Sequence, residues 1–213
     1  ASLGRFPLQE PVTRIFQQVG IGTLPLDIDV SAGKPGRVVM TQGNPTFGKI
    51  LRDVTPVGEA LGMDAGTLAG TRLPIQVVST GLAHLMVPLP DLDTAGRLQP
   101  NATLLDGLLG QCGALGCFAF SLQTTTPDTL AHARMFAPGA GVPEDPATGS
   151  AGTRVGHDRL VAVGSIAVTG IGASASAVPA DTPTVTAPSS RVRTTIVSGT
   201  PSGTVSVRRP TRR

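Results

Sequence analysis

Short runs of apolar and β-branched residues, separated by glycines, occupy the first part of the chain. The runs Val12–Val19, Leu24–Val30 and Arg37–Thr41 each have the length and composition of a β-strand. Glycine-containing segments at residues 20–22 and 31–36 break them, as turns between neighbouring strands do. The pattern therefore predicts three consecutive strands that form a β meander.

A helical pattern follows the meander. Asp53–Leu61 predicts a short helix that ends at Gly62, and Asp64–Leu68 predicts a further helical turn. We expect a first lobe of the molecule to end near Gly70, because strand-like sequence begins again after it.

Strand and helix patterns alternate from there to residue 136. Thr80 and Gly81 separate two apolar strand candidates, and glycine supplies the positive φ that a tight turn needs. Asn101 is a good N-cap for the longer of two helix candidates. Mixed strands and helices of this kind predict an α+β fold. The strand candidates are Leu73–Ser79, Leu82–Pro88, Cys117–Gln123 and Leu130–Phe136, and the helix candidates are Asp91–Leu98 and Ala102–Leu109.

The composition changes abruptly after Leu160. Residues 161–213 contain no Leu, Met, Phe, Lys or Glu and are rich in Ser, Thr, Ala, Val, Pro, Gly and Arg, so they lack core material. Ser165–Thr169 and Thr204–Val207 alternate as strands do, but several prolines interrupt the remainder. We expect residues 161–213 to form a low-complexity, poorly ordered tail.

The net charge of +3 is unevenly distributed along the chain. Residues 161–213 hold six arginines and one acid, whereas residues 1–160 hold 11 basic and 13 acidic residues and carry a charge of −2. The body is therefore mildly acidic despite a sequence pI near 9.5. With no Trp or Tyr it also lacks aromatic platforms for stacking bases, so we expect no nucleic-acid partner.

Cysteine and histidine patterns do not predict a metal site. Cys112 and Cys117 are the two cysteines, and His84, His132 and His157 show no short ligand spacing that would complete a site with them. We expect two free core thiols and no metal. No signal-peptide pattern and no apolar run of about 18 residues is present, so we expect a cytoplasmic protein that does not bind membranes.

The stretch Ala133–Ala151 carries the strongest functional signal. Pro146 suits the first turn of a helix, and Asp145 before it is the natural N-cap. Unpaired N–H groups at the positive end of such a helix would bind a carboxylate or phosphate. The alternative is an ordinary capped helix that satisfies its own N–H groups. The residues of this predicted first turn include Gly149, Ser150 and Ala151.

A second motif allows a different class of function. Gly43–Lys49 fits the first seven positions of a phosphate-binding P-loop. Ile50 stands where the motif needs Ser or Thr for Mg²⁺, and Pro45 removes an N–H that should contact phosphate. A nucleotide-binding protein is therefore the weaker alternative.

Several segments together resemble one family. Arg134–Pro138 followed by Gly141–Ala151, with Gln76–Leu85 and Val38–Gln42 upstream, resembles the PhzF family of phenazine-biosynthesis-like isomerases, which have the diaminopimelate-epimerase fold. The resemblance covers roughly residues 12 to 155 and implies a two-lobed α+β fold. It divides the chain into residues 1–72, an incomplete first lobe, residues 73–160, the second lobe, and the tail. It also implies a cofactor-independent isomerase or epimerase that moves a proton on a small carboxylate-bearing metabolite.

The resemblance assigns roles to four residues. It implies that Asp145 is catalytic, binding or polarising the substrate, while Gly149, Ser150 and Ala151 bind the substrate through N–H and hydroxyl groups. Related two-thiol epimerases need a cysteine at each of two helix starts, and neither cysteine of this chain lies near the motif. We therefore exclude that mechanism.

The family's proton-carrying Glu and its partner His lie in Glu-Thr and Gly-His-Pro-Thr segments that have no match in this chain. Glu10, Glu59 and Glu144 remain, and none is a convincing substitute, although Glu144 is the first to examine. We therefore expect weak activity from this chain by itself, and a non-catalytic fragment of such an enzyme is the alternative. A meander left with an unpaired edge and an uncovered apolar face would favour association, so a homodimer is an assembly that the sequence allows.

Overall fold

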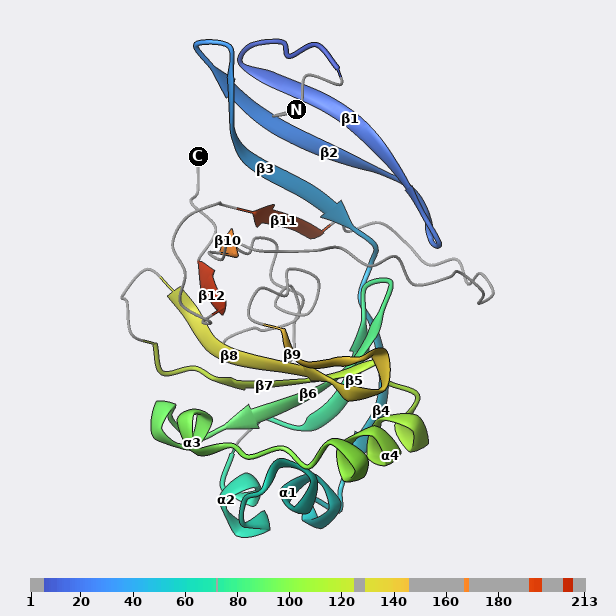
Figure 1. Ribbon diagram of the computed structural model, residues 1–213, viewed down its shortest axis with the longest axis vertical. Coiled ribbons are helices and arrows are strands. Elements are labelled where there is room, and N and C mark those ends of the chain that lie inside the picture. Colours follow the sequence, from blue (N-terminus) through green and yellow to red (C-terminus); the bar gives the residue numbers. More distant parts are fainter. Residues whose placement is uncertain are drawn as a thin grey trace.

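The structure is a computed structural model that describes residues 6–71, 73–124, 129–145, 167–168, 192–196 and 205–208. Its described part contains two β-sheets and four α-helices (Figure 1). The helices lie on one side of the second sheet, and the first sheet lies on the other side (Figure 1). The predicted α+β class is confirmed.

The first sheet begins with the predicted meander. Strands β1 (Val12–Val19), β2 (Gly22–Ser31) and β3 (Lys34–Gln42) pair antiparallel in sequence order. At the turn between β2 and β3, Ala32 and Gly33 both have positive φ, of 51° and 69°. The Glu10 carboxylate accepts a hydrogen bond of 2.7 Å from the Gly33 N–H and so holds this turn in place.

Three short strands from the last quarter of the chain complete the two sheets. β11 (Val192–Ile196) pairs with β3, β10 (Ala167–Val168) pairs with β11, and β12 (Val205–Arg208) pairs with β8 of the second sheet. One edge of the meander, that of β3, is therefore covered by β11, and β1 forms an edge of the described sheet. The segments expected to alternate as strands overlap β10 and β12. The other residues of 161–213 lie outside the described part, so poor order of the tail stays a prediction.

The second sheet has the order β12-β8-β7-β6-β5-β4, with β9 alongside β8. β6 and β7 run parallel, because the chain between them crosses over through two helices, whereas the other neighbours pair antiparallel. The strands are β4 (Thr46–Leu51), β5 (Ile75–Ser79), β6 (Ala83–Leu89), β7 (Gly116–Ser121), β8 (Thr129–Ala137) and β9 (Val142–Asp145).

Strand β4 was not expected from the sequence. It pairs with β5 and is the first strand of the second sheet along the chain. The chain leaves the first sheet at Gln42 and enters the second at Thr46. The division into lobes near residue 72 stays a prediction.

The four predicted helices are present, although the first begins at Thr55 rather than Asp53 and the last continues past Leu109 to Cys112. Helix α1 (Thr55–Leu61) ends at Gly62, which adopts the left-handed conformation at φ 68°. The side chains of Asp64, Asp91 and Asn101 cap the helices that follow them by accepting backbone N–H bonds. The capping bonds from Thr94 lower the pKa of Asp91. The capped helices are α2 (Ala65–Ala69), α3 (Leu92–Arg97) and α4 (Ala102–Cys112).

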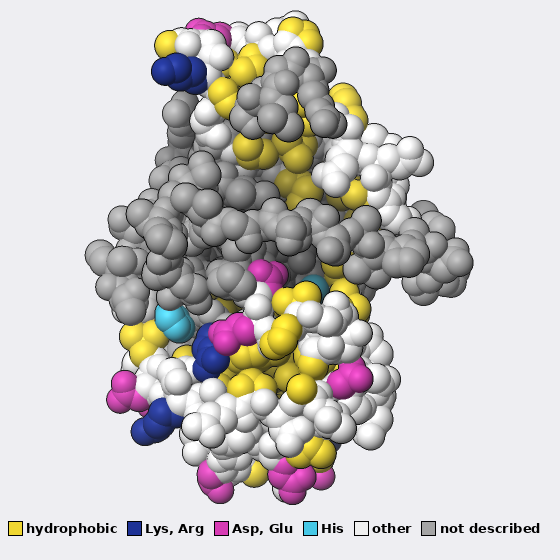
Figure 2. Space-filling model, viewed as in Figure 1, with side chains coloured by type: hydrophobic (Ala, Val, Ile, Leu, Met, Phe, Trp, Pro, Cys, Tyr) yellow, Lys and Arg dark blue, Asp and Glu magenta, His cyan; other side chains and the backbone are white. Residues whose placement is uncertain are grey.

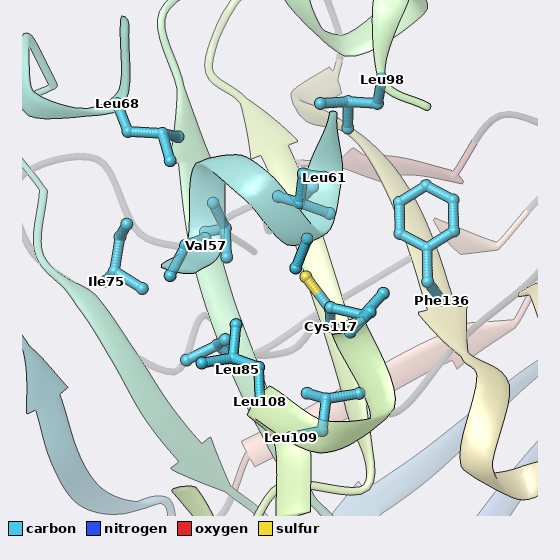
Figure 3. Close-up of a cluster of buried hydrophobic side chains, with 14 of the residues drawn as sticks. Val57, Leu61, Leu68, Ile75, Leu85, Leu98, Leu108, Leu109, Cys117 and Phe136 are labelled. Atoms are coloured by element: carbon cyan, nitrogen blue, oxygen red, sulfur yellow. The ribbon is translucent and has the colours of Figure 1, made fainter. Parts of the chain in front are cut away.

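Apolar side chains pack on both faces of the second sheet. One set, which we call the helix-side cluster, fills the space between the sheet and the helices (Figure 3). The other, the inner cluster, lies on the opposite face, because side chains alternate along each strand. The helix-side cluster includes Val57, Leu61, Leu68, Leu85, Leu109, Cys117 and Phe136. The inner cluster comprises Val78, Met86, Phe118, Phe120, Ala131, Ala133, Met135 and Ala137.

Candidate active site

Asp145 is the last residue of β9 and lies at the inner face of the second sheet. It pairs with Met135 of β8, and paired residues of antiparallel strands project to the same face. Met135 belongs to the inner cluster, so the Asp145 side chain is on the side that faces the first sheet (Figure 1). Asp145 is half-buried. Its side chain is therefore partly shielded from water at this face.

The other three predicted site residues lie beyond the described part. Gly149, Ser150 and Ala151 fall in residues 146–151, together with the helix that we expect to start at Pro146. Their roles as N–H and hydroxyl donors therefore stay predictions.

Glu144 points to the opposite side of the sheet from Asp145. Its two carboxylate oxygens accept hydrogen bonds from Arg134 on β8, from Nε at 2.7 Å and from Nη2 at 2.9 Å. Because neighbouring residues of a strand alternate in direction, this ion pair lies on the helix side. Glu144, the first glutamate to examine as a proton carrier, is thus directed away from the face of Asp145.

Arg134 has more partners than Glu144 alone. Its Nη1 group donates to the backbone carbonyls of Ala95 and Leu98 at 3.0 and 3.1 Å, and its guanidinium carbon lies 5.0 Å from the centre of the Phe136 ring. The hydrogen bonds to Glu144 raise the pKa of Arg134. The sequence pattern did not predict a role for Arg134. Its signal is an arginine in the middle of an otherwise apolar strand, which requires nearby acceptors.

The two remaining glutamates, Glu10 and Glu59, lie in other parts of the structure than β9. Glu10 accepts from the Gly33 N–H at the β2–β3 turn, and Glu59 is exposed on α1. Among the described residues, Glu59 and Glu144 therefore both lie on the helix side of the second sheet, on the opposite face from Asp145.

Two hollows open on the helix side, and Asp145 lines neither. The larger, of about 840 Å³, lies between the α1–α2 junction and α3, with Arg134 in its wall. The smaller, of about 200 Å³, lies beside α4 and includes Glu144 and Phe136. The larger hollow lacks the residues that carry the predicted chemistry, so its size alone does not make it the active site. Its polar lining includes Asp64, Thr67, Thr94, Arg97, Gln99 and Arg134.

The structure defines the surroundings of the two cysteines and of His84 and His132. Both cysteines are free, and burial raises the pKa of Cys117 to about 12. His84 is 2% exposed, with Nδ1 3.1 Å from the Leu82 carbonyl oxygen. Burial and the nearby Arg134 charge lower the pKa of His132. Across the described ranges, no three His, Cys, Asp or Glu side chains come together in a way that could hold a metal ion.

The P-loop alternative is contradicted by the backbone. Residues 46–51, which include Lys49, form strand β4 and pair with β5. A phosphate-binding loop must wrap an anion and lead directly into a helix. An extended edge strand does neither.

In Figure 2, acidic and basic side chains are scattered over the visible face of the described part, with no broad basic patch. Among the helices of the described ranges, none has both the length and the apolar character needed to span a membrane.

Known proteins similar to this chain agree with the fold. An uncharacterized isomerase of Clostridium acetobutylicum is 33% identical over 146 residues, which cover 68% of this chain and 48% of the relative. A trans-2,3-dihydro-3-hydroxyanthranilate isomerase of Pseudomonas chlororaphis is 31% identical over 65% of this chain and 45% of the relative. The crystal structure of a Bacillus anthracis PhzF-family protein superimposes with a TM-score of 0.57 at 28% identity, covering 68% of this chain and 48% of that one.

This chain spans about half the length of the curated relatives that it matches. The family model for PhzC-PhzF, described as phenazine biosynthesis-like protein, matches residues 4–159. That range includes the meander, strands β4 to β9 of the second sheet and Asp145, and it confirms the predicted resemblance. The chain therefore belongs to the PhzC-PhzF family of phenazine biosynthesis-like proteins.

Proposed function

We propose that this chain contributes to an isomerase activity that moves a proton on a small carboxylate-bearing metabolite. In this activity Asp145 acts on the substrate. The observation that carries the proposal is the position of Asp145 at the inner face, at the start of the string most specific to the family. Relatives named as isomerases support the reaction class, and the hydroxyanthranilate named for one of them is itself a carboxylate.

The chemistry requires a group that removes a proton from carbon and one that returns it. In this proposal Asp145 binds or polarises the substrate at that carbon. The N–H groups expected at Gly149, Ser150 and Ala151 bind the substrate carboxylate, since helix N-termini attract anions. A glutamate from a Glu-Thr segment of the family pattern would carry the proton, because none of the described glutamates reaches this face.

Exchange of substrate hydrogen with solvent deuterium tests the proposal. The natural full-length protein is incubated in D₂O with a panel of small carboxylates that have an acidic C–H, and loss of the proton signal is followed by NMR. Asp145→Asn should lower the exchange rate by ~10²-fold or more, the usual cost of losing an acid–base or polarising group. Asp93→Asn, which changes an exposed aspartate on α3, is the matched control and should exchange at the normal rate.

Two results would contradict the proposal. If the normal protein exchanges hydrogen on none of the carboxylates in the panel, the result supports the alternative that the protein is non-catalytic. If exchange occurs and Asp145→Asn matches the control, Asp145 has no part in the mechanism.

A further inference from the structure

We propose that Arg134 is a positioning residue for Asp145. Its two hydrogen bonds to Glu144 on the helix side fix the orientation of β9. With β9 held in this orientation, the side chain of the next residue, Asp145, is directed to the inner face. This inference rests on the proposed function only where it predicts turnover. Its structural part concerns β9 and can be measured without a substrate.

Strand β9 is poorly held by its backbone alone. It has four residues, and its register with β8 is recorded at two positions, Met135↔Asp145 and Ala137↔Val142, with an irregularity between them. Pro143 within it has no N–H to donate. Val142, Pro143 and Glu144 are exposed, so little burial stabilises the strand. Another interaction is needed to prevent β9 from rotating or fraying.

The Arg134–Glu144 pair supplies that interaction. Two parallel hydrogen bonds of 2.7 and 2.9 Å join the guanidinium to both carboxylate oxygens, and a bidentate pair fixes orientation as well as distance. Because Glu144 and Asp145 are adjacent in a strand, holding the first side chain on one face holds the second on the other.

Arg134 is itself fixed before it contacts Glu144. Its Nη1 donates to the carbonyls of Ala95 and Leu98, which lie at the C-terminal end of α3, where helix carbonyls lack intrahelical partners. Phe136 lies against the guanidinium at 5.0 Å. The guanidinium group is therefore held against α3. Only an arginine has enough N–H donors in one plane to reach both α3 and Glu144. Position 134 thus links α3 to the carboxylate at residue 145.

The chain offers a matched control in the first sheet. Arg14 donates from Nε to Asp27 Oδ1 at 2.6 Å and from Nη2 to Asp27 Oδ2 at 2.9 Å, which is the same bidentate arrangement between β1 and β2. Arg14→Lys and Arg134→Lys each keep the positive charge and remove the bidentate hydrogen bonds of the guanidinium. Glu144→Gln is the second test variant, and because Glu144 is exposed it should fold normally.

The test compares these three variants with the normal full-length protein by amide hydrogen exchange and by steady-state kinetics. Arg134→Lys and Glu144→Gln should raise exchange across Val142–Asp145 by ~10-fold or more, whereas Arg14→Lys should leave it unchanged. With a substrate found as above, both should lower kcat by ~10-fold or more and change KM by less than about threefold, because a small misplacement acts mainly in the transition state.

The outcomes separate the two proposals. Unchanged exchange at β9 in both variants overturns the positioning role. Equal losses of thermal stability and kcat in Arg14→Lys and Arg134→Lys would also overturn it, because they would indicate a purely structural pair. If the normal protein turns over nothing, the proposed function fails, and the exchange at β9 by itself decides whether Arg134 holds the strand.

Discussion

At the scale of single residues, burial decides what the two cysteines can do. Cys117 is fully buried in the helix-side cluster near Leu61 and Phe136 (Figure 3), and removal from water disfavours its thiolate. Cys112 is half-buried, and its pKa is also raised mainly by burial. A thiolate is the reactive form of cysteine, so neither is set up as a nucleophile.

We predict that Cys117 resists alkylation in the folded protein at pH 8 and reacts once denaturant is added, as measured by mass spectrometry. Because its folded pKa of about 12 exceeds the ordinary value of 9, the unfolded chain loses the proton first as pH rises. The contribution of Cys117 to stability is therefore complete below pH 9 and declines between about pH 9 and 12. Cys117→Ala should show less of this decline in denaturant titrations. Rapid labelling of native Cys117 at pH 8 would refute the buried assignment.

At the scale of secondary structure, the pairing of β11 with β3 was not expected from the sequence. Thr194 lies opposite Met40 in the middle of an antiparallel ladder that covers five residues of β11. The two strands are about 150 positions apart in sequence, so their pairing must offset a long loop closure. The ladder also occupies the edge of the meander that would otherwise be open to another chain.

We predict that the amides of Val192–Ile196 are protected from hydrogen exchange and that Thr194→Pro removes this protection. Proline cannot donate to the ladder and does not fit the middle of a paired strand. Thr194→Val, which keeps the backbone donor and suits a strand, is the control and should exchange normally. Rapid exchange of β11 in the unmodified protein would instead mean that this segment does not pair in solution.

At the scale of the whole molecule, the two sheets are joined by more than the single connection between β3 and β4. The last quarter of the chain adds β10 and β11 to the first sheet and β12 to the second. Asp145 lies on the face of the second sheet that is directed toward the first sheet (Figure 1).

We predict that the chain as printed has turnover ~10²–10⁴-fold below that of a version extended upstream by a Glu-Thr and a Gly-His-Pro-Thr segment, because this is the usual contribution of a general acid–base. The solvent-deuterium assay measures both. The matched control is the extended version with the Glu of the added segment changed to Gln, which should return to the low rate. Equal activity in the printed and extended chains would mean that a glutamate already present carries the proton.

The sequence by itself determined the elements whose causes are local. The meander, the end of α1 at Gly62 and the start of α4 at the Asn101 cap follow from side-chain period and from hydrogen bonds within a few residues. The family string identified Asp145 as the residue to examine, although Gly149 to Ala151 still await a test.

Only the tertiary structure decided which elements meet. Strand β4 joins the second sheet and β11 covers β3 because of partners distant in sequence, which the period of a strand does not specify. In the same way, Glu144 and Asp145 are adjacent acids in the sequence and equivalent in charge. The pairing of β9 with β8 assigns Asp145 to the inner face, while Arg134, anchored on α3, holds Glu144 on the other. That difference depends on which face of the sheet the helices cover.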